Sequence, residues 1–254
     1  MKGEFVLMHL KPIGTVLEIN RYPVKSFAGE TLNSVKLEPY GLLGDRSHAF
    51  VDDTKEGWSR YITARQYPEM LRYKAELITP LSKLDFPQVK ITCPDGRTHQ
   101  WDEQLLRDIP FFSDQKLSME RYRLTSQEQL AVDDGSILII TDQSIQKLEQ
   151  IWGKRIDNRR FRANFMLGLF DEALYDESSF VGKQLTIGNA QLSIKSLCER
   201  CSMITIDPDT QQRESSLLKK IHETMDLNFG VYADVEQVGM VHVGDQVYIS
   251  IEDE

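Results

Sequence analysis

The feature that most constrains the fold is a long series of short apolar runs, many of them β-branched, that turn residues separate. These runs lie at residues 14–19, 35–37, 48–51, 89–92, 137–140, 165–167, 185–187, 191–196, 203–206 and 246–251. Between two of them, Gly188-Asn189 suits a two-residue type II′ hairpin because glycine comes first. Strands at this spacing, with few helices, predict a mainly β protein built from antiparallel barrels or sandwiches.

Helical periodicity is confined to a few segments. Ser144–Trp152 places its apolar side chains on one face and stops at Gly153, and Leu217–Met225 has a similar pattern. A short helix is also expected at 102–107, before Pro110. The helices are therefore expected to decorate a β framework.

The chain of 254 residues is long enough for one large domain or two closely packed ones. No repeat, low-complexity tract or Pro/Gly/Ser linker divides it. Strand-like runs before Gln100 and after Phe161 flank a more helical middle. We therefore predict two packed, barrel-like parts, residues 1–95 and 96–254, with the boundary within 95–125.

The charge balance argues against two classes of partner. There are 39 acidic and 30 basic residues, a net charge of −9, whereas binders of nucleic acid or membrane surfaces are expected to be positive. No apolar run approaches the ~18 residues that a membrane-spanning helix needs, and the N-terminus has no small-residue cleavage site. We expect a cytoplasmic protein without a membrane span and without a nucleic-acid partner.

The three cysteines are too few for a disulfide framework or for an iron–sulfur cluster held by four thiolates. Two of them form Cys198-Glu199-Arg200-Cys201. Half of a zinc site would need a second ligand pair that the sequence does not offer, and a thioredoxin-like dithiol should open a helix. A reactive thiolate beside Arg200 and a pair of inert core cysteines both remain open.

Further motifs have ordinary structural interpretations when taken singly. They are Tyr22-Pro23-Val24-Lys25-Ser26, Gly44-Asp45-Arg46, Thr63-Ala64-Arg65-Gln66, Arg162-Ala163-Asn164 and Asp207-Pro208-Asp209-Thr210. The last, for example, is good turn chemistry in any protein. Together, in this order, they resemble the MOSC-domain family, in which an N-terminal MOSC β-barrel precedes a MOSC domain, as in the mitochondrial amidoxime-reducing components and their bacterial relatives. The resemblance runs from about Ile13 to Ile249.

The resemblance implies binding of the molybdenum cofactor, with a protein thiolate as metal ligand. By motif match the ligand is Cys201, and a soft thiolate suits a metal that the pterin also binds through sulfur. The match assigns further cofactor-binding positions to Lys25, Ser26, Arg46, Ser136, Arg162, Asn164, Arg200 and Tyr232. Arginine and lysine are the natural partners of an anionic, phosphorylated pterin. The sequence departs from the family at Ala163, where relatives carry proline, and matches only loosely at 134–136.

The resemblance also implies a reaction, the reduction of N-hydroxylated compounds such as amidoximes, hydroxylamines and N-hydroxylated bases. Asp134 is the candidate for shuttling protons in that reaction. Because the chain has no dinucleotide fingerprint, no ferredoxin-type cysteine set and no extension to house a flavin, electrons are expected from a separate protein. The alternatives are a carrier of sulfur, as a persulfide on Cys201, or of the cofactor, and a barrel that binds a small anion without turnover.

Overall fold

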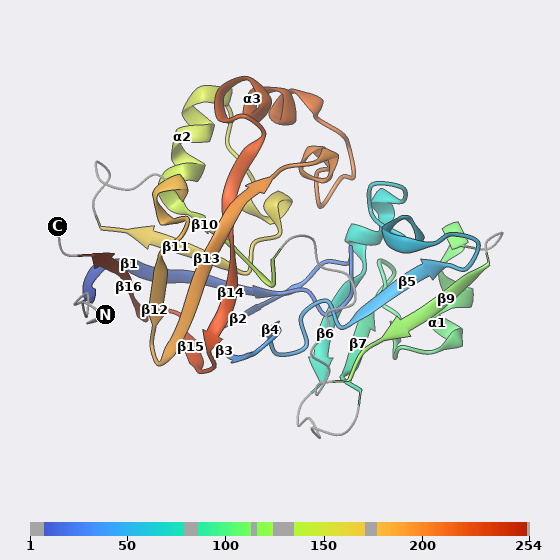
Figure 1. The fold of residues 1–254 in the computed structure, drawn as a ribbon. Helices are drawn as coiled ribbons and strands as arrows, with labels where there is room; N and C mark the ends of the chain where they lie inside the picture. The colour runs from blue at the N-terminus through green and yellow to red at the C-terminus, as the bar shows by residue number, and fades with distance from the viewer. Residues whose placement is uncertain (1–7, 79–85, 113–115, 124–134, 171–176, 253–254) are drawn as a thin grey trace.

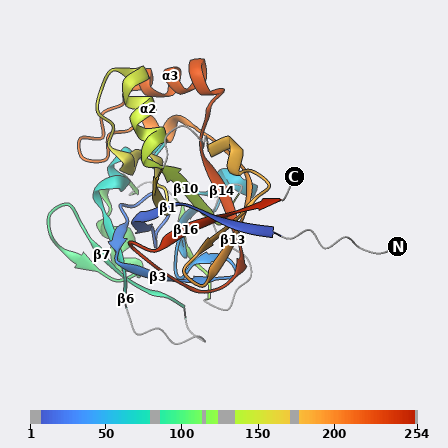
Figure 2. The ribbon, with the colours of Figure 1, turned by 90° about the vertical axis from the view of Figure 1, so that its left-hand side faces the viewer.

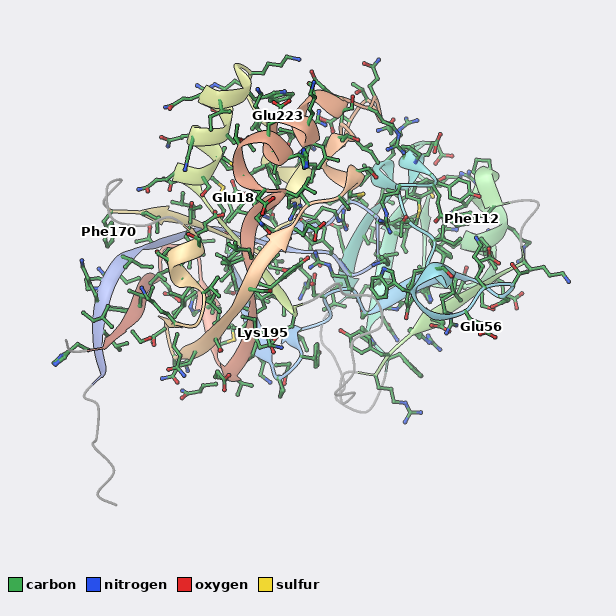
Figure 3. All side chains as sticks on the ribbon, turned by 45° about the horizontal axis from the view of Figure 1, so that its top comes forward. Glu18, Glu56, Phe112, Phe170, Lys195 and Glu223 are labelled. Carbon is green, nitrogen blue, oxygen red and sulfur yellow. The ribbon has the colours of Figure 1, made fainter. Side chains whose placement is uncertain are left out.

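The computed structural model describes residues 8–78, 86–112, 116–123, 135–170 and 177–252. Within them the chain is mainly β, which confirms the predicted fold class. Figure 1 shows two parts, a large barrel with helices above it and a small lobe beside it. In Figure 3, Lys195 marks the barrel, and Glu56 and Phe112 mark the small lobe.

The barrel is closed by seven strands in the order β11, β10, β14, β13, β12, β16 and β1, with β1 pairing back to β11. The strands are β1 (Met8–Arg21), β10 (Ile137–Thr141), β11 (Phe165–Leu169), β12 (Gln184–Ile187), β13 (Ala190–Glu199), β14 (Asn228–Gln237) and β16 (Gln246–Glu252). All neighbours are antiparallel except β10 and β11. The predicted hairpin at Gly188-Asn189 joins β12 to β13, and Gly188 has a φ of 58°.

Strand β1 closes the barrel because it is long enough to serve two neighbours. Its first half pairs with β16, beside which it runs in Figure 2, and its second half pairs with β11. The change of partner falls at a bulge next to Gly14, where an added Cβ would lie 2.2 Å from the Gly168 carbonyl oxygen. Only glycine allows the two backbones to come this close, so Gly14 makes the closure possible.

Apolar side chains from alternating strand positions fill the barrel, among them Ile19, Phe165, Leu192, Val231 and Ile249. A second apolar cluster joins the outside of β10 and β14 to helices α2 (Asp142–Trp152) and α3 (Ser215–Met225). Both helices fall where the periodicity predicts them, and α2 ends at Gly153 in the left-handed conformation.

The small lobe consists of residues 48–78, 86–112 and 116–121. It contains β5 (His48–Asp52) paired with β9 (Leu117–Arg121), and a sheet of β6 (Lys74–Ile78), β7 (Gln88–Thr92) and β8 (Thr98–His99). Its helical turns are η1 (Gly57–Arg60), η2 (Pro68–Arg72), α1 (Glu103–Asp108) and η3 (Pro110–Phe112). Phe27, Phe50 and Ile91 belong to its separate apolar core.

Short strands connect the two parts. Strand β2 (Glu30–Leu32) extends the barrel sheet beside β1, and β3 (Ser34–Glu38) pairs with β4 (Gly41–Leu42) and β15 (Met240–His242). Three 3₁₀ turns complete the described structure: η4 (Asn158–Phe161), η5 (Glu177–Phe180) and η6 (Ser202–Thr205).

The strand predicted at 203–206 is wrong, because η6 occupies it. Its turns are closed by hydrogen bonds from Ile204 N to the Cys201 carbonyl and from Ile206 N to the Met203 carbonyl. β-branched residues favour strands only where a neighbouring strand offers them a surface, and Arg160 instead takes the carbonyls of this segment.

Candidate functional site

A cavity of about 530 Å³ lies between the barrel and the small lobe. Its lining comes from widely separated parts of the chain: Lys25, Ser26, Arg46, Trp58, Thr63, Arg65, Gly135, Leu138, Phe161, Arg162, Asn164, Cys198, Glu199, Arg200, Cys201, Met203 and Tyr232. The structure thus brings most of the residues singled out in the sequence to one place.

The two paired cysteines differ in their surroundings. Cys198, the last but one residue of β13, is buried against the apolar cluster under α2 and α3, whereas the Cys201 thiol is exposed at the start of η6. Both line the cavity. Only Cys201 combines exposure with a place on the cavity wall, as a metal ligand requires.

Arg200 faces the other cysteine. Its guanidinium donates from Nη1 to Cys198 Sγ at 2.9 Å and from Nη2 to the Phe161 carbonyl at 2.8 Å. The motif predicts this charge beside the reactive thiolate, but the two terminal nitrogens of the guanidinium bind Cys198 and Phe161 instead, while Arg200 still lines the cavity. The Nε of Arg200 is buried and has no hydrogen-bond partner among the described residues.

A buried polar network joins Asp45 and Arg46 to the Arg162-Ala163-Asn164 segment. Asp45 is fully buried, forms an ion pair with Arg46 and accepts from Tyr22 N at 2.6 Å. Arg46 donates to Asn164 Oδ1 and to the Arg162 carbonyl, both at 3.1 Å. These contacts connect segments more than 100 residues apart in the sequence and fix one wall of the cavity.

Tyr22 lies under the two arginines of this wall. The guanidinium carbons of Arg46 and Arg162 are 4.7 Å and 4.2 Å from the centroid of its ring, close enough for cation–π attraction. Burial raises the pKa of the Tyr22 hydroxyl, which donates to the Ala163 carbonyl. The ring therefore acts as a neutral support that holds two positive charges toward the cavity.

Three lining residues have left-handed backbones, which side-chain-bearing residues seldom adopt. The φ angles are 67° for Ser26, 45° for Arg46 and 55° for Arg162. Such conformations cost free energy and persist where the surroundings enforce them, often at functional sites. They occur at three of the predicted cofactor-binding positions, so the surrounding structure enforces an unusual backbone along this wall of the cavity.

Some predicted residues play other parts. Asn164 is buried, and its side-chain amide is occupied by Asn20, Asp45, Arg46 and the Leu138 N–H. It therefore supports the site from within the protein. Ser136 is not on the lining, because its hydroxyl donates to the Ala233 carbonyl on β14.

The loosely matched loop is described only in part. Asp134 lies outside the described residues. Gly135 touches Tyr232 so closely that an added Cβ would lie 2.5 Å from the tyrosine Cβ, so glycine is needed there. Tyr232 is buried and contributes to the lining.

Trp58 and Arg65 line the cavity although neither was predicted as a site residue. Trp58 is 45% exposed, and the Lys25 ammonium lies 4.6 Å from the centroid of its ring. Arg65 sits in the quoted Thr-Ala-Arg-Gln motif, which could have suggested it. For Trp58 the sequence carries no comparable signal.

The lining suits an anionic ligand that carries a metal with affinity for thiolate. The described lining contains five basic residues and one acidic residue, Glu199. The basic residues are Lys25, Arg46, Arg65, Arg162 and Arg200. This local excess of positive charge contrasts with the net charge of −9 for the whole chain. With an exposed thiol and an unpartnered Arg200 Nε, the donor set fits a phosphorylated group that carries a soft metal.

Comparisons with known proteins identify the family of the chain. The model of the MOSC N-terminal beta barrel domain matches residues 13–135, and that of the MOSC domain matches residues 126–248. The chain belongs to the MOSC family. The matches run through the described lining of the cavity, from Lys25 to Tyr232.

Curated relatives of this MOSC protein include mitochondrial amidoxime-reducing component 1 of Homo sapiens, which is 26% identical over 94% of this chain and 84% of its own. Mitochondrial amidoxime reducing component 2 of Macaca fascicularis is 28% identical with the same coverage. Molybdenum cofactor sulfurase of Caenorhabditis briggsae is 23% identical over 86% of this chain but only 33% of its own.

Among solved structures, the YUAD protein from Bacillus subtilis covers 97% of this chain and all of its own, with a TM-score of 0.52 and 14% sequence identity. At that identity the likeness concerns the fold. Within the part of the chain that the structure describes, no helix is both long and apolar enough to cross a membrane.

Proposed function

We propose that this MOSC protein is an oxidoreductase that binds the molybdenum cofactor and reduces N-hydroxylated compounds. The observation that carries the proposal is the exposed Cys201 thiol, which shares one cavity with Lys25 and a group of arginines. The names of the amidoxime-reducing relatives supply the reaction class.

The residues that would hold the cofactor form two groups, one for its metal and one for its phosphate. Cys201 would provide the thiolate ligand to molybdenum, while Lys25, Arg46 and Arg162 would hold the phosphate of the pterin. When bound, the group would supply the two-electron redox chemistry that reduction of an N–OH group needs. The protein orients it and surrounds it with fixed positive charge, so that little reorganisation is needed on binding.

The overall reaction takes two electrons and two protons for each N–OH group, cleaves the N–O bond and releases water. Asp134 remains our candidate for delivering protons. Trp58 and Met203 give the lining apolar surface on which the rest of an N-hydroxylated substrate can pack.

We propose that a separate electron-transfer protein supplies the electrons. We also propose that the protein works in the cytoplasm. Purified protein loaded with cofactor should reduce an amidoxime with reduced methyl viologen, but should not turn over with NADH or NADPH alone. Sustained NADH-dependent turnover without another protein would overturn this part of the proposal.

The main test uses protein produced in a host that makes the molybdenum cofactor. Benzamidoxime, hydroxylamine and an N-hydroxylated base are assayed anaerobically with reduced methyl viologen, and molybdenum and pterin are measured in the same preparation. The proposal predicts reduction of at least one of these compounds in proportion to molybdenum content. Fully loaded protein that reduces none of them would contradict it.

A second candidate, a carrier of sulfur or of the cofactor, is favoured by the exposure of Cys201 and by the similarity to molybdenum cofactor sulfurase. A carrier would take the outer sulfur of a donor persulfide onto the Cys201 thiolate, which leaves the donor as a thiol, or would transfer its cofactor to an apo-enzyme. Mass spectrometry of Cys201 after incubation with a sulfur donor, together with a transfer assay, separates this candidate from the reductase.

A further inference from the structure

The Asp-Pro-Asp-Thr motif has no part in the lining of the cavity, yet its first carboxylate is fully engaged. Asp207 Oδ1 accepts from Asp209 N at 3.1 Å and from Thr210 N at 2.8 Å, which folds the turn of the motif itself. Asp207 Oδ2 accepts from Arg160 Nη2 at 2.7 Å. One oxygen thus shapes the turn while the other holds an arginine from a distant segment.

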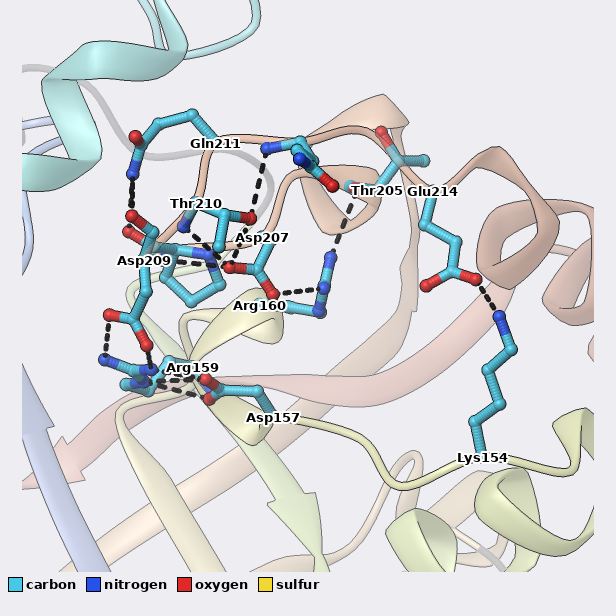
Figure 4. Close-up of polar contacts among 12 residues, drawn as sticks. Lys154, Asp157, Arg159, Arg160, Thr205, Asp207, Asp209, Thr210, Gln211 and Glu214 are labelled. Atoms are coloured by element: carbon cyan, nitrogen blue, oxygen red, sulfur yellow. Dashed lines mark hydrogen bonds and ion pairs between the residues drawn. The ribbon is translucent and has the colours of Figure 1, made fainter.

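Arg160 links the Asp207 carboxylate to η6, the turn that directly follows Cys201. Its side chain is 8% exposed, and Nη1 donates to the Thr205 carbonyl at 3.1 Å. Thr205 ends η6, the turn that Cys201 opens. Figure 4 shows the guanidinium between Thr205 and Asp207.

A reciprocal contact lies on the other side of Cys201. Arg200 donates to the Phe161 carbonyl at 2.8 Å, so the residue before Cys201 is tied to the residue after Arg160. The cysteine is therefore bracketed by two arginines, each of which binds backbone of the other's segment. Arg162, which we assign to the phosphate of the pterin, directly follows Phe161 in the sequence.

We infer that Arg160 is a positioning residue that sets Cys201 relative to Arg162, and that the Asp-Pro-Asp-Thr motif holds Arg160 in place. The two ends of the cofactor would then be gripped by one rigid unit. As far as Cys201 is taken as the metal ligand, the inference rests on the proposed function.

Arg159 provides a matched control beside Arg160. It also pairs with the motif, through Asp209 at 2.6 Å, and with Asp157 at 2.5 Å. Its side chain is 54% exposed, however, and its hydrogen bonds among the described residues go to carboxylates rather than to the backbone of η6. Exposed pairs of this kind contribute little to stability.

The first test measures how fast molybdenum is lost from loaded protein during dialysis. Arg160→Gln should release the metal ~10-fold faster than wild type, the usual effect of removing a residue that supports a metal ligand. Arg160→Lys should lose metal almost as fast, because lysine keeps the charge but cannot bridge a carbonyl and a carboxylate as the planar fork does. Arg159→Gln should match wild type.

Ile91→Ala, in the core of the small lobe, controls for a general loss of stability. It should lower the melting temperature without speeding metal release. Release from Arg160→Gln no faster than from Arg159→Gln, or equally fast release from Ile91→Ala, would overturn the inference.

The second test needs no cofactor. Hydrogen exchange is measured on full-length protein produced without molybdate, and Arg160→Gln should speed exchange at Ile204 and Ile206, whose N–H groups close η6. Unchanged exchange there would also overturn the inference. Because this readout is independent of molybdenum, a wild type that binds no cofactor would defeat the proposed function and leave the positioning role to be decided by exchange.

Discussion

Two carboxylates, Asp45 and Asp207, each hold an arginine in a different setting: Arg46 lines the cavity, whereas Arg160 lies behind the turn that carries Cys201. Asp45 is fully buried and belongs to a network that joins the barrel to the residues leading into the small lobe. The Asp207 side chain is 29% exposed and lies in a turn beside the cysteine segment. Both carry a hydrogen-bonded ion pair, but only one sits where water cannot compensate for its loss.

The difference suggests that the two ends of the site, although Arg160 links them, depend on ion pairs of unequal strength. The wall built on Asp45 is part of what holds the fold together, so it should be fully formed before any ligand enters. The end of the site at Cys201 depends on the partly exposed Asp207–Arg160 pair, called the clamp below, and can loosen while the fold persists. Disturbing the first should therefore cost more unfolding free energy than disturbing the second, whose loss should fall mainly on the site.

The largest effect is expected for Asp45→Asn. An amide cannot accept from Tyr22 N and Asn164 while neutralising Arg46, and breaking a buried pair in this way costs ~3 kcal/mol of unfolding free energy. Urea denaturation followed by circular dichroism measures the loss. Asp234→Asn, which breaks an exposed pair with Lys195, is the control and should change stability by less than ~0.5 kcal/mol.

A smaller effect, ~1 kcal/mol, is expected for Asp207→Asn, because part of the lost hydrogen bonding is recovered from solvent. The same denaturation experiment applies. Equal losses for Asp45→Asn and Asp207→Asn would erase the distinction between the two ends.

The clamp should also respond to acid. Hydrogen bonds, first from Thr210 N–H, hold the pKa of Asp207 below its ordinary value of 3.8. The folded state therefore binds this proton less readily than the unfolded chain, so the contribution is present above pH 3.8 and falls away as pH drops through the lowered pKa. Wild type should lose more stability than Asp207→Asn below pH 3.8, and parallel pH profiles would contradict this assignment.

The smallest effect is expected for Ser26→Gly. Glycine adopts the φ of 67° without the penalty of a Cβ, so the melting temperature should rise slightly, by the equivalent of at most ~1 kcal/mol. If Ser26 also contacts the cofactor, molybdenum retention should fall as stability rises. A drop in stability would show that the side chain supports the wall more than its backbone strains it.

Local sequence patterns predicted the framework well. Short apolar runs between turn residues located β1, β10 and β13, and the periodicity before Gly153 located α2, because these elements depend on neighbours within a few residues. The segment 203–206 was missed because Arg160, more than 40 residues away, takes its carbonyls. No local pattern can report such a contact.

The candidate site was predicted through its motifs, and the roles within it were only partly separable. Lys25, Arg46, Arg162 and Cys201 meet in the cavity, but Asn164 turned out to serve the protein interior. An amide that braces a loop and an amide that binds a ligand look alike in a sequence. Only the hydrogen-bond partners distinguish them.

The central claim, that Cys201 holds molybdenum in this cavity, is tested most directly by the metal content of two cysteine variants. Wild type, Cys201→Ser and Cys198→Ser are purified from a host that makes the cofactor, and molybdenum is measured per chain. We predict that Cys201→Ser loses nearly all of the metal, since an alcohol replaces a soft thiolate poorly, while buried Cys198→Ser retains most of it. Molybdenum in Cys201→Ser at the wild-type level would contradict the account.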